Sequence, residues 1–313
     1  MAHQHHNNHP LFSVIIPTYN RAHVLPRVLQ SILNQTLIDF ELIIVDDGSN
    51  DDTAKVIRNF CDDRIHYVKQ DNQGVSEARN NGVIHSTAPY LTFIDSDDEA
   101  LPEWLSSFAR ALNDKTTGIV CCGINVVSQS EEKLEVVYLP KEMGFLFEYQ
   151  KGLFLAGSFA LRRELFDKVG GYAAGLSYSE NTELAFRLIP YCLQDGLRIV
   201  TIQKALVIYH KQSVSTPLGA RKSKMFLYSA EYILHHHHQK LNHDPPNFAV
   251  FCGIAGVNAI RLRQYGRGIS YFLTAIRKEP SNWKHYFRLG LSLFPPLGRL
   301  FWLRSNPKTW MGE

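Results

Sequence analysis

Short apolar runs alternate with helix-length amphipathic stretches in the first part of the chain, and this pattern restricts the fold more than any other feature. The runs span residues 12–17, 40–45, 65–68, 90–94 and 118–122, and the predicted helices span 22–35, 52–60, 75–86 and 102–112. Continuous apolar, β-branched runs are typical of strands buried on both faces. The alternation therefore predicts an α/β fold with a mainly parallel sheet flanked by helices.

The first four predicted strands all end in polar residues. The four ends read Thr18-Tyr19-Asn20, Asp46-Asp47-Gly48-Ser49, Asp71-Asn72-Gln73-Gly74 and Asp95-Ser96-Asp97-Asp98. In open α/β sheets, ligands bind beyond the carboxyl ends of the strands. We therefore expect a ligand crevice at this edge, with several carboxylates in it.

The pattern changes along the chain and predicts three segments. After about residue 125 it is less regular, with predicted strands at 157–163 and 200–210 and predicted helices at 164–169 and 180–189. From about residue 219 the chain reads as helical to its end. We expect a disordered leader over 1–10, one α/β domain over 11–218 and a helical extension over 219–313.

The net charge of +3 for 313 residues conceals an uneven distribution. Residues 261–313 hold ten lysines and arginines against two acids, a balance of +8, which leaves −5 for residues 1–260. The basic segment is interleaved with tryptophan, tyrosine and phenylalanine, a mixture that suits an anionic membrane surface. The alternative is a helical appendage whose aromatic side chains form its own core. No nucleic-acid-binding module is recognisable, so we expect no nucleic-acid partner.

Cysteine spacing and hydropathy indicate the cellular compartment to expect for this protein. The five cysteines are odd in number and lack the Cys-x-x-Cys spacing of a zinc site, as in reduced intracellular proteins. The start of the chain has no apolar leader, and no stretch reaches the roughly 18 apolar residues of a membrane span. We expect a cytoplasmic protein, peripheral at the inner face of the membrane if the basic segment binds one.

Three carboxylates directly follow the fourth predicted strand: Asp95, Asp97 and Asp98. Clustered carboxylates repel one another unless a cation lies between them. Oxygen ligands together with substrate phosphates suit Mg²⁺ or Mn²⁺. The alternative is that one acid caps the helix beginning near Pro102, although capping needs only one acid.

The other polar positions are weaker signals. Asp46 or Asp47 could accept hydrogen bonds from a nucleobase or a ribose, or could belong to an ordinary turn. Tyr19 could stack on a base or simply pack. Arg79 could neutralise a diphosphate or lie on a solvated helix face.

Four of these segments resemble the nucleotide-sugar half of family 2 glycosyltransferases, which have a GT-A fold. The segments are VIIPTYNRAHVLPRVLQSILNQT, FELIIVDDGSNDDT, DNQGVSEARNNGV and YLTFIDSDD, and the likeness continues through GSFALRRELFDKVGGY. The resemblance implies a nucleotide-sugar half over 11–115 and an acceptor half over 116–218. It also implies transfer of a sugar from a nucleotide diphosphate donor to an acceptor hydroxyl, usually with inversion.

The same resemblance implies roles for individual residues. Donor binding would fall to Pro17, Tyr19, Asp46, Asp47, Arg79 and Asp95. The metal would fall to Asp97, Asp98 and His210, the last in the segment VIYHKQS.

The chain departs from this family at the catalytic base. Inverting members typically carry Glu-Asp at the start of the acceptor-side helix, whereas this chain has Glu180-Asn181. An amide has no basic lone pair with which to deprotonate an acceptor. Three accounts remain open: Asn181 replaces an original aspartate, Glu180 is the base, or the protein binds its donor without turning it over, as a silent binding or membrane-scaffold protein. A nucleotidyltransferase is a further alternative, although the phosphate loop expected of one is missing after the first strand.

Overall fold

The computed structural model describes residues 9–128, 134–140, 154–211 and 219–293. The chain divides into two compact units, and each is described here by itself. Unit 1 comprises residues 1–175 and 180–213, and unit 2 comprises residues 176–179 and 214–313. Most of the predicted leader and the end of the basic segment, from residue 294 on, lie outside the described residues.

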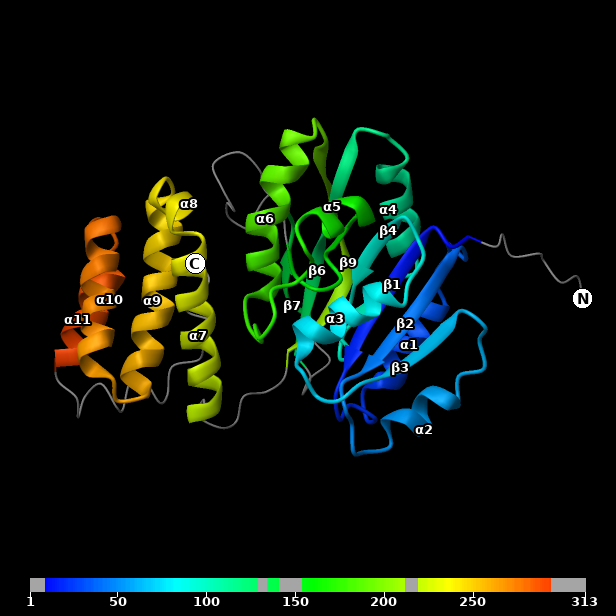
Figure 1. Cartoon of the computed structure of the whole chain (residues 1–313), viewed down its shortest axis with the longest axis horizontal. Helices are drawn as coiled ribbons and strands as arrows, with labels where there is room; N and C mark the ends of the chain where they lie inside the picture. Colours follow the sequence, from blue (N-terminus) through cyan, green and yellow to red (C-terminus); the bar gives the residue numbers. More distant parts are fainter. Residues whose placement is uncertain (1–8, 129–133, 141–153, 212–218, 294–313) are drawn as a thin grey trace, which may run out of the picture. The chain divides into compact units, whose positions relative to one another are not determined.

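Unit 1 alternates strands and helices in its first half and is less regular in its second (Figure 1). Its strands are β1 (Phe12–Thr18), β2 (Phe40–Asp46), β3 (Ile65–Lys69), β4 (Tyr90–Phe93), β5 (Glu99–Ala100), β6 (Thr117–Ser128), β7 (Leu134–Tyr138), β8 (Phe159–Arg162) and β9 (Arg198–Lys211). Its helices are α1 (Leu25–Leu33), α2 (Thr53–Arg58), α3 (Val75–Ile84), α4 (Trp104–Leu112), α5 (Arg163–Lys168) and α6 (Glu180–Gln194).

The described strands form one sheet in the order β3-β2-β1-β4-β8-β6-β9-β5, with β7 paired to β6. Strands β1 to β4 are mutually parallel where they pair, and β6 is parallel to β9. Strand β8 lies antiparallel to both β4 and β6. The strands of the first half form the parallel run that their apolar pattern predicted, and the second half mixes parallel and antiparallel pairs. The α/β sheet flanked by helices confirms the predicted fold class.

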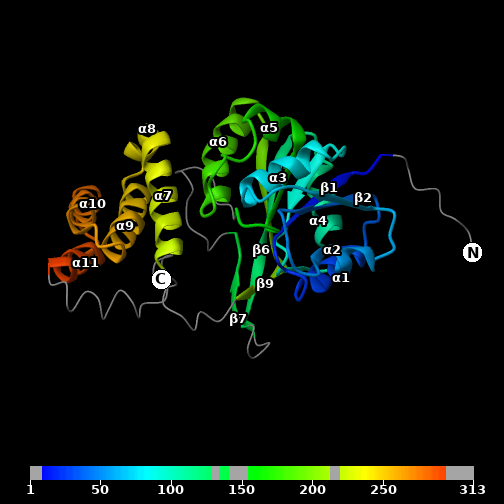
Figure 2. The ribbon, with the colours of Figure 1, turned by 60° about the horizontal axis from the view of Figure 1, so that its bottom comes forward.

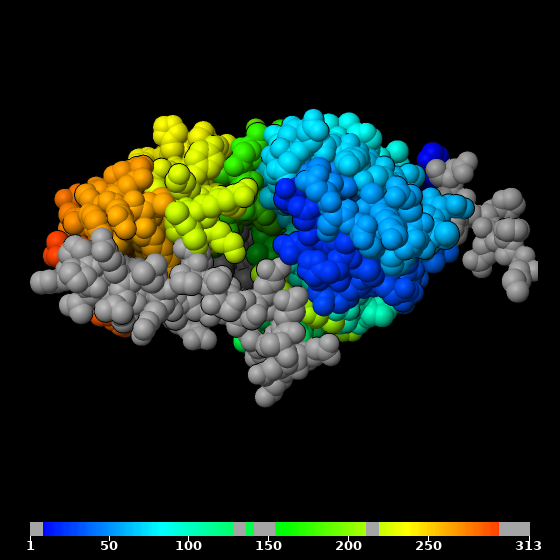
Figure 3. Space-filling view, turned by 90° about the horizontal axis from the view of Figure 1, so that it is seen from below, coloured from blue at the N-terminus to red at the C-terminus, as the bar shows by residue number. Residues whose placement is uncertain are grey.

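Helices cover both faces of this sheet (Figure 2). On one face, Val14 and Ile16 of β1 pack in a core that includes side chains of α1, α2 and α4. On the other face, Ile15 packs in a second core with α3, α5 and α6. All seven residues of β1 are buried, which is why Val14, Ile15 and Ile16 are consecutive apolar residues with no polar alternation. In the space-filling view, the blue and cyan residues of the first half form a continuous surface (Figure 3).

Three features of unit 1 were not predicted from the sequence. Strand β7 lies in the irregular region after residue 125, where no strand was expected before residue 157. Strand β5 has two residues and pairs with the long strand β9, so it leaves no periodic signal. Helix α6 continues through Pro190 to Gln194, beyond the predicted end at residue 189. Buried side chains lie on both sides of the proline, at Ile189 and Cys192, and this packing outweighs the hydrogen bond that proline removes.

Unit 2 is helical throughout its described residues after 219. Its helices are α7 (Ala220–His236), α8 (His238–Asn242), α9 (Pro245–Arg261), α10 (Tyr265–Lys278) and α11 (Trp283–Leu293). Helix α9 packs against α7 and α10. A Cβ atom at Gly256 would lie 2.6 Å from the ring of Phe272, so glycine allows the close approach of α9 and α10. The predicted helical extension is therefore present. Over the described ranges, every helix is too short or too polar to cross a bilayer.

Candidate active site

The two acids at the end of β2 are buried and fully engaged by neutral donors. Asp46 accepts hydrogen bonds from the backbone N–H of Ser49 at 2.8 Å and from the hydroxyl of Tyr67 at 2.7 Å. Burial, followed by the bond to Asp46, raises the pKa of Tyr67 to about 12. Asp46 therefore fixes the turn after β2 and ties it to β3.

Asp47 organises the loop that leads into α3. Its carboxylate accepts the backbone N–H groups of Gln73 and Gly74 and the side-chain amide of Gln70, all at 2.8 Å. Gly48 follows with φ +82°, and an added Cβ would lie 3.0 Å from the backbone nitrogen of Asn72. Both acids at the end of β2, which the resemblance assigns to donor binding, thus hold the loops that follow β2 and β3.

The end of β1 supplies an exposed aromatic side chain. Pro17 is buried within the strand, whereas Tyr19 is 45% exposed directly after it. Asn20 adopts φ +53° and donates its backbone N–H to Ser49 Oγ at 2.8 Å, which holds the turn against the end of β2. An exposed ring on a fixed turn is suited to stacking on a flat ligand.

The acids that follow β4 face cations and one another. Asp98 is 2% exposed, and its pKa is raised by burial and by the charges of Asp95 and Asp97. Asp97 Oδ2 lies 3.8 Å from Arg21 Nη2, and its carbonyl oxygen accepts Arg27 Nη2 at 2.5 Å. Burial is the largest cause of the raised pKa of Asp98, and repulsion from the two neighbouring carboxylates adds to it. A divalent cation bound beside these carboxylates would favour their ionised forms.

The structure places His210 beside the acidic loop, but its ring contacts a glutamate. Its backbone N–H donates to Asp98 Oδ1 at 3.2 Å, while Nε2 lies 2.5 Å from Glu99 Oε1. Throughout the described ranges, no three His, Cys, Asp or Glu side chains converge as ligands of one ion. Magnesium commonly takes only one or two protein carboxylates and completes its shell with water and substrate phosphates, so the acids after β4 fit such a site.

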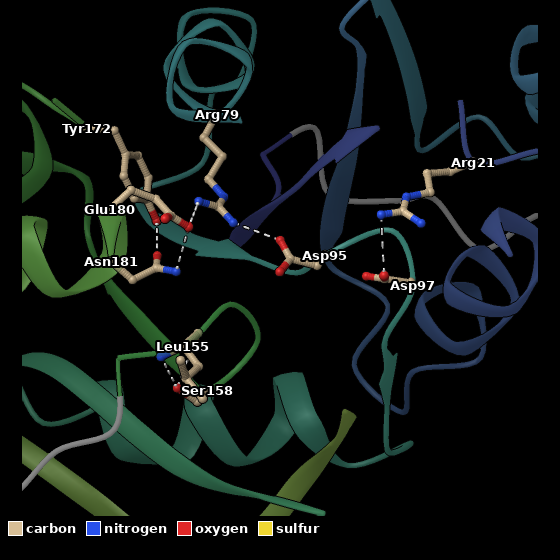
Figure 4. Close-up of polar contacts among 9 residues, drawn as sticks. All are labelled: Arg21, Arg79, Asp95, Asp97, Leu155, Ser158, Tyr172, Glu180 and Asn181. Atoms are coloured by element: carbon tan, nitrogen blue, oxygen red, sulfur yellow. Dashed lines mark hydrogen bonds and ion pairs between the residues drawn. The ribbon is translucent and has the colours of Figure 1, made fainter. Parts of the chain in front are cut away.

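Arg79 of α3 is buried between carboxylates from the two halves of unit 1 (Figure 4). The side chain is 1% exposed, with Nη2 2.7 Å from Asp95 Oδ1 and Nη1 2.9 Å from Glu180 Oε1. Burial alone would lower the pKa of Arg79, but Asp95, Tyr172 and Glu180 outweigh it and raise the pKa. The interpretation that Arg79 approaches a diphosphate stays a prediction, because in this structure both terminal nitrogens hold carboxylates.

The pair at the start of α6 completes a closed set of contacts with Arg79 (Figure 4). Tyr172 donates its hydroxyl to Asn181 Oδ1 at 2.8 Å, and Asn181 Nδ2 donates to Glu180 Oε1 at 3.3 Å. The guanidinium carbon of Arg79 lies 5.1 Å from the centre of the Tyr172 ring. Asn181 is therefore fixed with its amide nitrogen toward Glu180.

Several residues that sequence reasoning missed belong to this arrangement. Asn80 exchanges two hydrogen bonds with the backbone of Tyr172, at 2.8 and 2.9 Å. Asn81 donates to Gln70 Oε1 at 2.7 Å, and Gln70 holds Asp47. A Cβ at Gly171, where φ is +73°, would lie 2.7 Å from Asn80 Oδ1. The available signal was the run Arg79-Asn80-Asn81 inside a helix, because three successive positions span more than half of the helix circumference, so at least one polar side chain faces the sheet and needs a buried partner.

Comparisons with known proteins identify the family to which the chain belongs. Residues 13–170, half of the chain, match the family described as Glycosyl transferase family 2. A segment of 109 residues is 41% identical to the GalNAc(5)-diNAcBac-PP-undecaprenol beta-1,3-glucosyltransferase of Campylobacter jejuni, covering 34% of this chain and 35% of that protein. The chain thus spans about a third of that relative's length.

Solved structures support the fold. The chain resembles S. aureus TarS 1-349 in complex with UDP-GlcNAc, with a TM-score of 0.61 and 16% identity over 92% of this chain and 88% of that one. It also resembles the mannosyltransferase PcManGT of Pyrobaculum calidifontis in complex with GDP-Man and Mn²⁺, with a TM-score of 0.56 and 15% identity over 97% and 88%. At these identities the likeness establishes a shared fold.

Proposed function

The chain belongs to glycosyl transferase family 2, and on that premise we propose that it transfers a sugar from a nucleotide diphosphate donor to an acceptor hydroxyl, with inversion. One observation carries the proposal: a single buried side chain, Arg79, joins the acidic loop after β4 to the pair Glu180-Asn181. The group proposed to bind the donor, Asp95, and the group proposed to act on the acceptor, Glu180, therefore both contact Arg79. The nucleotidyltransferase alternative has no support in this geometry.

The donor would lie along the strand ends. Tyr19 offers an exposed ring for the nucleobase, next to the turns that Asp46 and Asp47 hold in place. Asp95 and Asp97 face the region where ribose and diphosphate would lie. Bound there, Mg²⁺ or Mn²⁺ would neutralise the charge that develops on the leaving diphosphate, with Asp97 as its first protein ligand and Asp98 and His210 as further candidates.

We propose Glu180 as the general base of this chain. Glu180 Oε1 accepts bonds from Arg79 and Asn181, whereas Oε2 has no partner in the described part of the chain. In the reaction, the acceptor O–H bond breaks and its proton passes to Glu180. The acceptor oxygen bonds to the anomeric carbon, and the nucleoside diphosphate leaves with the electron pair of the broken bond.

Two variants at the start of α6 test this assignment. Wild type, Glu180→Gln and Asn181→Asp are assayed with UDP- and GDP-linked sugars in MnCl₂, following donor hydrolysis and transfer. We expect Glu180→Gln to lower the rate on the order of 100-fold or more, since general bases contribute about 10²–10⁴. If Glu180→Gln is unchanged while Asn181→Asp gains at least 100-fold, position 181 is the base site. Calorimetric donor binding without product from any variant would favour the silent-binder alternative.

Helix α11 supports a second proposal, that unit 2 binds an anionic membrane surface. The exposed apolar residues of this helix share one face: Trp283, which is 66% exposed, Tyr286, Phe287 and Leu293. The opposite face is buried through His285 and Ser292. Residues 261–313 carry a charge of +8, which complements anionic headgroups. The Campylobacter jejuni relative is named for an undecaprenol-linked acceptor, so we propose a lipid-linked acceptor at that surface.

Vesicle sedimentation tests the membrane proposal. We expect the full chain to bind phosphatidylglycerol-containing vesicles and not pure phosphatidylcholine, and the double variant Trp283→Ser/Phe287→Ser to lose at least tenfold in partitioning. The matched control is Ile84→Ser, which removes an exposed apolar side chain from unit 1. Equal loss with the control, or self-association that the double variant abolishes, would overturn the proposal.

A further inference from the structure

Arg79 is enclosed by groups that come from distant parts of unit 1. Asp95 lies 16 residues away in the sequence and Glu180 lies 101 residues away. No hydrogen bond joins these two carboxylates to each other within the described ranges, so the guanidinium is their connection. A guanidinium presents its N–H groups in a rigid fork, which allows one side chain to fix two carboxylates at once.

The burial of Arg79 shows that the connection is not a surface ion pair. Its Nε atom is buried and has no hydrogen-bond partner, so the side chain has lost solvent without gaining a full set of bonds. Burying a cation is strongly unfavourable unless nearby charges compensate. Both carboxylates are therefore needed to hold Arg79, and a change at one of them alters how firmly Arg79 holds the other.

Contacts on the acceptor side extend this connection to the reacting groups. Glu180 Oε1 accepts a hydrogen bond from the side-chain amide nitrogen of Asn181, and Asn181 Oδ1 accepts one from the Tyr172 hydroxyl. The Tyr172 ring lies against Arg79, and Asn80 fixes the Tyr172 backbone. Arg79 and Asn80, which are adjacent in α3, thus set the position of the pair Glu180-Asn181.

We propose that Arg79 is a positioning residue that couples the donor loop to the acceptor-side pair, so that contacts made by Asp95 with a donor change the placement of Glu180 and Asn181. This inference rests on the proposed function. It differs from a diphosphate-binding role, in which Arg79 would act mainly on donor affinity.

The kinetic test compares Arg79→Lys with Arg187→Lys. Lysine keeps the charge but cannot hold two carboxylates in fork geometry. We expect Arg79→Lys to lower kcat about 30-fold or more while the donor KM changes less than about threefold, since orientation is lost and binding is kept. Arg187 of α6 is the matched control, because it pairs bidentately with Glu183 and also holds backbone carbonyls. A large rise in donor KM with unchanged kcat would overturn the proposal in favour of direct diphosphate binding.

A ligand-free measurement separates this inference from the proposed function. The side-chain amide of Asn181 gives two proton signals in a nitrogen–proton NMR correlation spectrum, assigned by their loss in Asn181→Asp. We expect them to move in Arg79→Lys and in Asp95→Asn, although neither residue bonds to Asn181. They should stay in place in Arg64→Lys, which alters a bidentate pair with Asp62 at the start of β3. Asp95→Asn gives the answer even if Arg79→Lys does not fold. Unmoved signals in Asp95→Asn would refute the coupling, whereas absence of donor binding would refute only the proposed function.

Discussion

Acids follow both β2 and β4, but their burial and their partners differ: Asp46 and Asp47 are buried at β2, whereas at β4 only Asp98 is. At β2, Asp46 and Asp47 accept only neutral donors, which are backbone N–H groups, amides and a hydroxyl. At β4, Asp95 and Asp97 face arginines, and Asp98 retains a raised pKa. The acids at the end of β2 therefore hold loops, whereas at β4 burial and the charges of Asp95 and Asp97 disfavour the ionised form of Asp98, and we propose that a bound cation would stabilise it.

The largest expected effect is that of Asp97→Asn, which tests the β4 side of the comparison. Loss of the charge should lower transfer on the order of 100- to 1000-fold, as for removal of one electrostatic group at a developing charge. The melting temperature should change by less than about 2 °C, since the ion pair of Asp97 with Arg21 is 3.8 Å long and joins two partly exposed side chains. Coupled donor assays and thermal melts check both. Full activity, or a large loss of stability, would remove the distinction between the two strand ends.

Asp47→Asn tests the β2 side. An amide can offer only one oxygen to the three donors that Asp47 now accepts, and its NH₂ group would face a backbone N–H. We expect the free energy of unfolding to fall by about 2 kcal/mol, measured by urea denaturation. The exposed Asp71 of the same loop supplies the control variant Asp71→Asn, which should have little effect. Equal effects of the two substitutions would contradict a loop-holding role.

Gly48→Ala sharpens the comparison further, because it disturbs the β2 turn without changing charge. Gly170 has a similar positive φ of +76° but open space around it, so Gly170→Ala reports backbone strain alone. We expect about 1 kcal/mol for Gly170→Ala and about 2 kcal/mol for Gly48→Ala, whose Cβ meets the backbone of Asn72. Denaturation curves of both variants measure the difference. If Gly170→Ala were the more damaging, crowding at the β2 turn would be refuted.

The smallest expected effect is a pH dependence of the free energy of unfolding that arises from Tyr67, which bonds to Asp46 at the end of β2. Its pKa is raised from 10.0 to about 12, so the unfolded chain loses this proton first as the pH rises. The stabilisation is complete below pH 10 and declines toward pH 12, by no more than about 1 kcal/mol because the ring is partly exposed to solvent. Tyr67→Phe cannot titrate and should show a shallower alkaline loss in urea unfolding at about pH 9 and pH 11. Identical losses would contradict the assignment.

Elements that are marked by neighbouring residues in the sequence could be predicted, whereas elements that depend on distant residues could not. Strands β1, β2 and β4 are recognisable because burial on both faces requires consecutive apolar residues, as in Ile15 and Ile16. The two-residue strand β5 and the continuation of α6 beyond Pro190 depend on neighbours that are distant in sequence, and neither was foreseen. The same limit applied to the site, where the resemblance named Arg79 and Glu180 separately but did not connect them.

The sequence by itself determined the α/β class, the acidic strand ends and the departure at Asn181, because these depend on residue type and local spacing. Only the tertiary structure decided which acids are engaged by neutral donors and which lie beside arginines and other carboxylates. It also decided that Arg79 lies between Asp95 and Glu180. The physical reason is that a carboxylate is the same group in any sequence, whereas its charge and its availability depend on the donors that folding brings within about 3 Å of it.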